Sequence, residues 1–431
     1  MLSSDQRHTL TKRQLLAVCG SCVGGGALGG YAYRSGFLID DDCNPPPLDT
    51  SPTDWPLPHY DGGNTRTVPP ENAPTSGLSE RWSISVQNPA QPIVLNGSVF
   101  VTPEDPSTEI ITAYDVATGE EEWREHVSAS VDRLPLLAGG NSLFLGQEQQ
   151  NGDTVSKALA TADGSELWTS DVASEQVLAV LEAGLLLFQD SNKLLAVDAR
   201  VGEKCWQKRV SGGFMPSTIH AGETIVMNTF TTGEIIALNA RTGEQQWEAD
   251  ISEYFHSDAE NLNDSIVGRA VAGTDRVFFR TGGGMLIALD ATTGETDWVT
   301  PKTHPEVPTE GERHYLPPGF EPVAVADDAL VVIEWDGSDR SDSLHAIDPT
   351  SGAEQWEFEP EEEEDVHIHS AAVAGETVFV PVMEEFYLID LASGEILETH
   401  DLSGYAQSVS LCYGLCLVAT TEGIVAFEET S

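Results

Sequence analysis

The sequence predicts an all-β protein, an eight-bladed β-propeller built from four-stranded antiparallel blades. Two observations predict this fold: one short motif recurs along the chain, and a second hairpin pattern precedes copies of that motif. Residues 236–247, IALNARTGEQQW, and residues 287–298, IALDATTGETDW, are two copies that share most of their letters. Because self-similarity at a fixed period is the signature of a repeat architecture, the motif decides the fold class.

Each copy of the motif is typical of a strand, a tight turn and a second strand that ends in tryptophan. A glycine stands four residues before the tryptophan in six copies, at Gly119, Gly164, Gly202, Gly243, Gly294 and Gly352. An acidic or amide residue stands four residues before that glycine in five copies, at Asp115, Asp198, Asn239, Asp290 and Asp348. Ala160 takes this position in the remaining copy. We expect the carboxylate to accept backbone N–H groups and the glycine to adopt positive φ.

The second hairpin lies upstream of the motif, as in residues 92–103, PIVLNGSVFVTP. Two hairpins per repeat give four antiparallel strands in about forty residues, which is the size of one propeller blade. The closing tryptophan is then expected to pack between neighbouring blades. The seven residues assigned to this structural role are Trp82, Trp123, Trp168, Trp206, Trp247, Trp298 and Trp356.

The end of the chain predicts how the ring closes. A seventh copy, residues 387–398, has Glu398 where tryptophan is expected, so we expect that seam to be the weakest. The residues after it suffice for three strands, whereas the segment around Trp82 has no blade of its own. We therefore expect the N-terminal strand around Trp82 to close the last blade, which removes the edges that an open sheet would expose.

The repeat resembles the pyrroloquinoline quinone (PQQ) propeller repeat, which quinoprotein alcohol dehydrogenases share with non-enzymatic relatives such as BamB. Residues 54–66, DWPLPHYDGGNTR, also resemble a segment that often precedes such propellers. The dehydrogenases hold their quinone with two adjacent cysteines and surround calcium with acidic and amide side chains. This chain contains no adjacent cysteine pair. The resemblance therefore implies a BamB-like, non-enzymatic member, with no catalytic residues, no metal ligands and no cofactor.

The charge of the chain indicates its setting. The 70 acidic residues outnumber the 21 basic residues, for a formal net charge of −49. Such a charge is self-repulsive in ordinary buffer, whereas molar salt shortens the Debye length to about 3 Å. We expect a protein from an extreme halophile, with an acidic surface. Nucleic acid is excluded as a partner because no basic patch is present to neutralise phosphates.

The N-terminal region is expected to lie outside the propeller. Residues 1–39 contain Lys12, Arg13 and a weakly apolar, glycine-rich run, which is typical of an export signal or membrane anchor. The segment resembles a twin-arginine signal with lysine in the first position, and a Sec signal is the other possibility. Residues 40–78 are rich in Pro, Asp and Thr and are expected to form a spacer, with the propeller in residues 79–431. The predicted location is extracytoplasmic and membrane-associated.

The six cysteines test this assignment. Cys19 and Cys22 lie in the signal and Cys43 in the spacer, and Cys205 is expected to be a small buried side chain on a strand. Cys412 and Cys416 flank a turn in the last blade. Their positions on the hairpin favour two buried thiols over a disulfide.

A binding site is expected in the loops. In a blade whose strands are A to D from the centre outward, the D-to-A and B-to-C connections share one face. The longest insertions, residues 248–268 and 299–320, together with residues 146–155 and 334–343, all belong to that face. The aromatic, histidine and arginine side chains of this candidate binding face are Tyr254, Phe255, His256, Arg313, His314, Tyr315, Trp335 and Arg340.

The function predicted from these observations is an exported, membrane-tethered scaffold that binds a protein partner at the cell surface. Aromatic and arginine side chains dominate the energetics of protein interfaces, which favours a protein partner. Two alternatives remain at this point: a PQQ-dependent dehydrogenase, and a propeller that senses a ligand. His367 and His369, which alternate along one strand, are more typical of core or channel lining than of a metal site.

Overall fold

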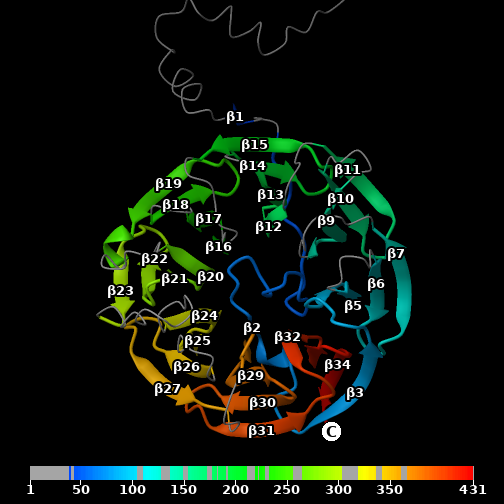
Figure 1. Ribbon diagram of the computed structural model, residues 1–431. Helices are drawn as coiled ribbons and strands as arrows, with labels where there is room; N and C mark the ends of the chain where they lie inside the picture. Colours follow the sequence, from blue (N-terminus) through cyan, green and yellow to red (C-terminus); the bar gives the residue numbers. More distant parts are fainter. Residues whose placement is uncertain are drawn as a thin grey trace, which may run out of the picture.

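The computed structural model describes residues 38–39, 43–103, 110–127, 136–148, 154–171, 177–181, 183–190, 193–210, 219–221, 223–228, 233–255, 265–302, 319–335, 342–360 and 366–430. These residues form eight four-stranded antiparallel blades arranged in a ring (Figure 1). The prediction of an all-β, eight-bladed propeller is confirmed. The only helical elements among the described residues are two short 3-10 helices, η2 (Pro70–Asn72) and η3 (Ser252–Tyr254).

The first four blades follow one another along the chain, each with its innermost strand first. Blade 1 contains β4 (Ile93–Leu95), β5 (Ser98–Val101), β6 (Ile110–Asp115) and β7 (Glu121–His126). Blade 2 contains β8 (Leu137–Gly139), β9 (Ser142–Glu148), β10 (Thr154–Ala160) and β11 (Glu166–Ser170). Blade 3 contains β12 (Val177–Leu181), β13 (Leu185–Asp190), β14 (Lys193–Asp198) and β15 (Lys204–Arg209). Blade 4 contains β16 (Ile219–Ala221), β17 (Thr224–Asn228), β18 (Glu234–Asn239) and β19 (Gln245–Asp250).

The next three blades repeat the pattern. Blade 5 contains β20 (Ile266–Ala272), β21 (Arg276–Thr281), β22 (Leu286–Asp290) and β23 (Thr296–Thr300). Blade 6 contains β24 (Gly319–Val325), β25 (Leu330–Trp335), β26 (Ser343–Ile347) and β27 (Glu354–Phe358). Blade 7 contains β28 (Ala372–Ala374), β29 (Thr377–Val382), β30 (Glu385–Asp390) and β31 (Ile396–Asp401).

Blade 8 joins the two ends of the chain. Its three inner strands are β32 (Ala406–Cys412), β33 (Leu415–Thr420) and β34 (Gly423–Glu429), and its outer strand is β3 (Leu78–Ser85). Strand β3 pairs with β34 in antiparallel register, with Trp82 opposite Ala426. The predicted closure by the strand around Trp82 is therefore confirmed.

Tryptophan and glycine of successive repeats meet at the seams between blades. The indole Nε1 of Trp247 in blade 4 donates to the carbonyl of Ala291 in blade 5 at 3.0 Å, and a Cβ on Gly294 would come within 2.5 Å of that indole. Each of the other six motif tryptophans donates to a carbonyl in the next blade. These donor and acceptor pairs are Trp82–Val116, Trp123–Thr161, Trp168–Ala199, Trp206–Ala240, Trp298–Pro349 and Trp356–Leu391. The repeat thus encodes the contact between blades.

Glu398 makes a different contact at the seam between blades 7 and 8. Its carboxylate accepts the backbone N–H groups of Gly77 at 2.9 Å and Leu78 at 3.1 Å. Blade 8 takes its outer strand from the other end of the chain, so no motif turn is available there for an indole to pack against. A carboxylate that binds the first N–H groups of β3 replaces the tryptophan at this seam.

Two cysteines far apart in the sequence join the N-terminal segment to blade 3. The short strand β1 (Leu38–Ile39) pairs with β15 on the outer edge of the blade, and Cys43 forms a disulfide with Cys205 on β15. Cys205 is buried on β15 as expected, but its disulfide was not predicted; the N-terminal segment brings Cys43 beside it, with a Cα–Cα distance of 5.2 Å. Cys412 and Cys416 are free and buried, which confirms the prediction of two thiols.

Residues 43–77, which we call the strap, lie against the ring; the described part of the expected spacer is therefore packed on the propeller (blue in Figure 1). The strap contacts every blade, mostly at the A-to-B turns. Its backbone hydrogen bonds to five blades are Trp55–Val94, Pro56–Ala138, Gly63–Ala272, Thr65–Val325 and Asn72–Gly414. It reaches blade 3 through the disulfide, blade 4 through Asn44 and Arg241, and blade 7 through β2 (Thr67–Val68), which pairs with β28 in parallel.

The residues quoted above for the lead-in to the propeller hold the strap in place. The fully buried carboxylate of Asp54 accepts the hydroxyl of Tyr413 at 2.8 Å and the backbone N–H of Asn96 at 3.0 Å. Trp55 is fully buried among residues of blades 1, 7 and 8. Asp61 accepts the N–H groups of Gly63 and Thr65 and so shapes the turn at the centre of the ring.

Candidate functional site

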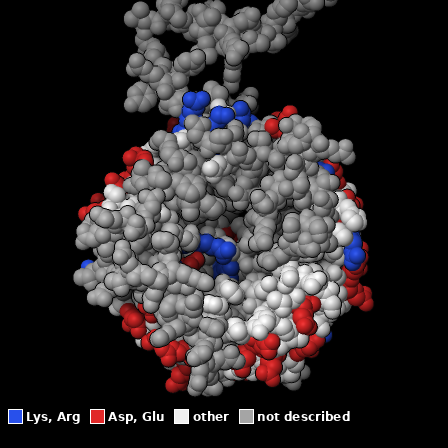
Figure 2. All heavy atoms as spheres, in the orientation of Figure 1, with Lys and Arg blue, Asp and Glu red and all other residues white. Residues whose placement is uncertain are grey.

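The ring has two faces, which the strap makes unequal. We call the face with the A-to-B and C-to-D turns the strap face, since the strap binds those turns. We call the other the open face, because it carries the D-to-A and B-to-C connections. Figure 2 views the open face, where residues outside the described part of the chain are grey, and shows a hollow at the centre of the ring with basic side chains inside it.

The sequence assigns the predicted binding residues to connections of the open face, and the structure describes few of them. His256, Arg313, His314, Tyr315 and Arg340 lie outside the described residues, and Trp335 is placed only as the last residue of β25. Tyr254 and Phe255 lie at η3, where both are partly buried and pack against the apolar cluster between blades 4 and 5. The structure therefore places two aromatic residues in the wall of the ring and does not test the rest of the set.

Three basic side chains meet where the strap reaches the innermost strand of blade 5. Arg66 and His59 come from the strap, and Arg269 comes from β20, the innermost strand of blade 5. Nδ1 of His59 is 2.7 Å from Nη2 of Arg66 and 3.3 Å from Nη1 of Arg269. Because both guanidinium groups donate to this nitrogen, His59 must be neutral with the proton on Nε2. We call these three residues the basic cluster.

The electrostatics of the basic cluster follow from its enclosure. Burial lowers the pKa of His59 well below its usual value, and the charges of Arg66 and Arg269 lower it further. Burial also lowers the pKa of Arg66 to about 9, with a smaller contribution from Arg269. The residue Arg269 is exposed, yet partial desolvation lowers its pKa too, and the charge of Glu321 opposes that shift. Both arginines remain charged at neutral pH.

The partners of the basic cluster are polar rather than acidic. Nη2 of Arg66 donates to the side-chain carbonyl of Gln91 at 3.3 Å, and Gln91 in turn donates to the carbonyl of Val409. Nη1 of Arg66 is buried and has no hydrogen-bond partner among the described residues. Glu321 on β24 raises the pKa of Arg269 by its charge and lies 3.6 Å from Arg280.

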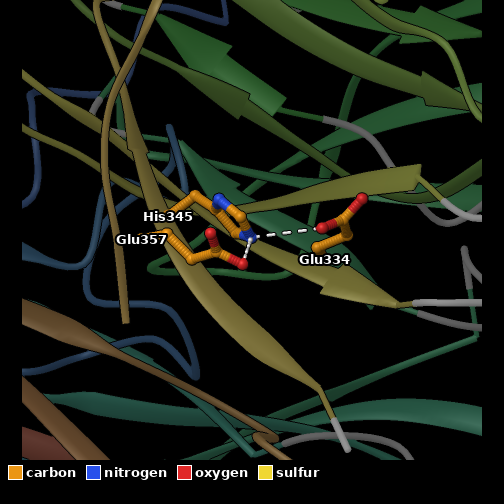
Figure 3. A group of neighbouring side chains, drawn as sticks. All are labelled: Glu334, His345 and Glu357. Atoms are coloured by element: carbon orange, nitrogen blue, oxygen red, sulfur yellow. Dashed lines mark ion pairs between the residues drawn. The ribbon is translucent and has the colours of Figure 1, made fainter. Parts of the chain in front are cut away.

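A second group of side chains lies within blade 6. Figure 3 shows His345 on β26 between Glu334 on β25 and Glu357 on β27. The imidazole Nε2 is 3.3 Å from a Glu334 oxygen, 3.9 Å from a Glu357 oxygen and 2.8 Å from the hydroxyl of Ser343. These ligand atoms are close enough to hold a divalent cation, and the same contacts are ion pairs when the imidazole is protonated. The group lies on the outer three strands, away from the hollow.

The other two histidines that the sequence singles out do not join a larger group. The rings of His367 and His369 are 6.2 Å apart and both side chains are exposed. His367 lies 3.4 Å from the Asp342 carboxylate. Among the described residues this arrangement supplies one carboxylate and two imidazoles, and it lies before the inner strand of blade 7 rather than in the core.

The sequence alone does not reveal the basic cluster. His59 and Arg66 lie within the lead-in segment 54–66, but no local pattern shows that this segment crosses the ring. The one signal in the sequence is that basic residues are scarce, since the chain has only 21 Lys and Arg residues. One of them, Arg66, lies in that segment, and another, Arg269, lies on an innermost strand. Scarcity alone does not place the two arginines beside each other.

The described residues define an eight-bladed propeller with a hollow at the centre of its open face. A family model for the outer-membrane protein assembly factor BamB matches residues 151–334, which is less than half of the chain. Together with the structural similarities, this match supports the resemblance to PQQ-repeat propellers. No protein of curated function matches the chain in sequence.

Three solved structures illustrate the similarity, which at these identities concerns the fold alone. BamB from Moraxella catarrhalis is 16% identical with a TM-score of 0.54, over 82% of this chain and 97% of that chain. A quinohemoprotein alcohol dehydrogenase from Pseudomonas putida HK5 is 12% identical with a TM-score of 0.62, over 88% and 81% of the two chains. Another from Comamonas testosteroni is 14% identical with a TM-score of 0.61, over 87% and 80%.

Proposed function

We propose that this chain is an exported, membrane-associated propeller that binds a protein partner on its open face and acts as an assembly scaffold at the cell surface. The observation that carries the proposal is the strap, which contacts all eight blades on one face and leaves the other to a partner. The match to a family model for an outer-membrane assembly factor supports the role and the location. No helix among the described residues has the length and apolar character needed to cross a membrane.

The main alternative is a PQQ-dependent dehydrogenase, since quinohemoprotein alcohol dehydrogenases share the fold. Calcium takes about six to eight oxygen ligands. The described side chains that meet where the strap reaches β20 are instead Arg66, Arg269 and His59, which are nitrogen donors with two positive charges. These nitrogen donors do not fit calcium, which argues against a calcium-bound quinone at this position. The absence of adjacent cysteines from the sequence supports the same conclusion.

An exposed aromatic side chain marks the described part of the open face. Tyr405, on the connection from β31 to β32, is 50% exposed, and its backbone is fixed by hydrogen bonds with Thr421. A rigid aromatic residue of this kind supplies contact area at a small entropic cost. On the strap face, Val201 in the C-to-D turn of blade 3 is equally exposed at 52%, and it provides a matched control position.

Site-specific photo-crosslinking in intact cells tests the proposal. A photoreactive phenylalanine analogue at Tyr405 should yield a discrete, higher-mass product with one partner protein, whereas the same analogue at Val201 should not. Both positions are exposed loops, so neither change should prevent folding, and a thermal melt of each purified variant checks this. Equal crosslinking from both faces, or none from Tyr405, would contradict an open-face scaffold.

A further inference from the structure

The geometry points to a binding site for a small, multiply charged oxyanion in the central hollow, formed by Arg66 and Arg269 and positioned by His59. This inference is independent of the proposed scaffold function. The ligand class is defined by what two guanidinium groups recognise, namely the oxygens of a phosphate or of a dicarboxylate.

The first argument is the arrangement of charge. Two arginines converge on one nitrogen of a neutral imidazole, at 2.7 and 3.3 Å. No carboxylate among the described residues forms an ion pair with either guanidinium, and Gln91 supplies only a neutral acceptor. Like charges held together in an enclosed place repel each other, and a bound anion would remove that repulsion.

The second argument is an unused donor. Arg66 is 4% exposed, and its Nη1 is buried with no hydrogen-bond partner in the described part of the chain. A buried charged donor without an acceptor costs free energy, which a bound oxygen would offset. Since Nε and Nη2 of Arg66 are occupied by His59 and Gln91, Nη1 is the donor left for a ligand.

The third argument is a comparison with the other arginines of the chain. Acidic residues are abundant, and arginines elsewhere on the ring pair with them at short distances. Such described pairs include Arg81–Glu428, Arg124–Glu121 and Arg276–Asp297. Within the described part of the chain, the basic cluster has no such short ion pair despite the net charge of −49, so its environment differs from that of these other arginines.

The route to the site is also indicated. The strap lies across the centre of the ring on one side, so a ligand approaches from the open face, where Figure 2 shows basic side chains inside the hollow. Arg269 is exposed on the innermost strand of blade 5, whereas Arg66, in the strap, is buried. Arg269 would therefore meet the anion first, and Arg66 would bind its inner oxygen.

Isothermal titration calorimetry of the purified full chain tests this inference. Inorganic phosphate and succinate are titrated separately at pH 7.5 and constant molar NaCl. We expect saturable one-site binding of at least one probe. Phosphate binding alone indicates a phosphate ligand, and succinate binding alone indicates a carboxylate ligand. No saturable binding of either probe at concentrations up to about 50 mM would overturn the proposal. A dissociation constant above that concentration corresponds to a binding free energy weaker than about 2 kcal/mol.

Two variants and a control locate the binding. Arg269→Gln removes the exposed guanidinium and should weaken the affinity at least about tenfold, the usual effect of losing a charged hydrogen-bond partner. Arg124→Gln removes an exposed surface arginine and should bind like the original protein. Arg66→Lys keeps the charge but loses the planar fork, and should also weaken binding. If Arg269→Gln and Arg66→Lys both fold and bind with unchanged affinity, the anion does not bind at the basic cluster.

Discussion

At the scale of single residues, the motif glycine meets two demands at once. Gly294 has φ of +74°, and a Cβ there would overlap the indole of Trp247. Gly97 has φ of +82° but open space around the Cβ position. Comparing the two positions therefore separates the cost of positive φ from the cost of steric overlap with the indole.

Substituting these glycines with alanine should give unequal losses of stability. Gly97→Ala should lower the free energy of unfolding by about 1–2 kcal/mol, the cost of positive φ for a residue with a Cβ. Gly294→Ala adds the overlap with the indole and should lower the free energy of unfolding by about 2–4 kcal/mol. Chemical denaturation of both variants measures the difference. Equal losses of stability in the two variants would show that the packing of the Trp247 indole does not require a glycine at position 294.

His59 should make stability depend on pH. Its pKa is lowered in the folded protein, so above pH 6.5 both states are neutral at this position, and below it the unfolded chain binds a proton that the folded protein does not. The free energy of unfolding should therefore fall as the pH drops from 7 to 5. His59→Gln keeps an acceptor for the arginines but cannot titrate, and should lose less stability over this range by about 2 kcal/mol.

Denaturation at pH 7 and pH 5 measures this effect. The exposed His126 on β7 provides the control, since His126→Gln should leave the pH dependence close to that of the original protein. A His59→Gln variant whose stability falls in parallel with the original protein would mean that His59 does not report the enclosure of the basic cluster.

At the scale of elements, Glu398 shows how the sequence adapts where the ring closes. The substitution of tryptophan by glutamate was visible in the sequence, but its reason was not. The reason is that blade 8 has no C-to-D turn, so that the carboxylate binds the first N–H groups of β3 instead.

Glu398→Ala should lower the free energy of unfolding by about 1–2 kcal/mol, because two backbone N–H groups lose a charged acceptor. Glu398→Trp should not restore stability, although it restores the motif, since no turn receives the indole. Glu395→Ala, at an exposed position in the same hairpin, is the control. A tryptophan variant more stable than the original protein would contradict this explanation of the seam.

The elements that the sequence predicted are those whose evidence is local or periodic. The blades, the turn glycines and the outer strand around Trp82 all follow from spacing along the chain. The strap and the Cys43–Cys205 disulfide could not be predicted in this way, because the two cysteines are 162 residues apart. The basic cluster depends on that same long-range placement, since it joins the strap to β20.

At the scale of the whole molecule, charge is the dominant property. Figure 2 shows acidic side chains around the rim of the ring, and the formal net charge is −49. Repulsion among these groups acts over about 10 Å at 0.1 M salt and over about 3 Å at 1 M. The compact ring should therefore be unstable in dilute buffer.

Raising KCl from about 0.1 M to 2 M should raise the melting temperature by at least about 5 °C, a shift that reflects roughly 4 kcal/mol in a domain of this size. The repulsion is screened, and no new contact is required. Sucrose at equal osmolality is the control, because it is excluded from the protein surface but does not screen charge. A melting temperature that follows osmolality rather than ionic strength would contradict the halophilic interpretation.

The central claim is that this propeller binds a partner and does not hold a quinone. The most direct measurement is a titration of the purified protein with PQQ and calcium in concentrated KCl, followed by quinone fluorescence and melting temperature. Our account predicts no saturable change in fluorescence and no calcium-dependent rise in melting temperature. Saturable binding with a calcium-dependent rise of several degrees would contradict it, and would identify the central hollow as an active site.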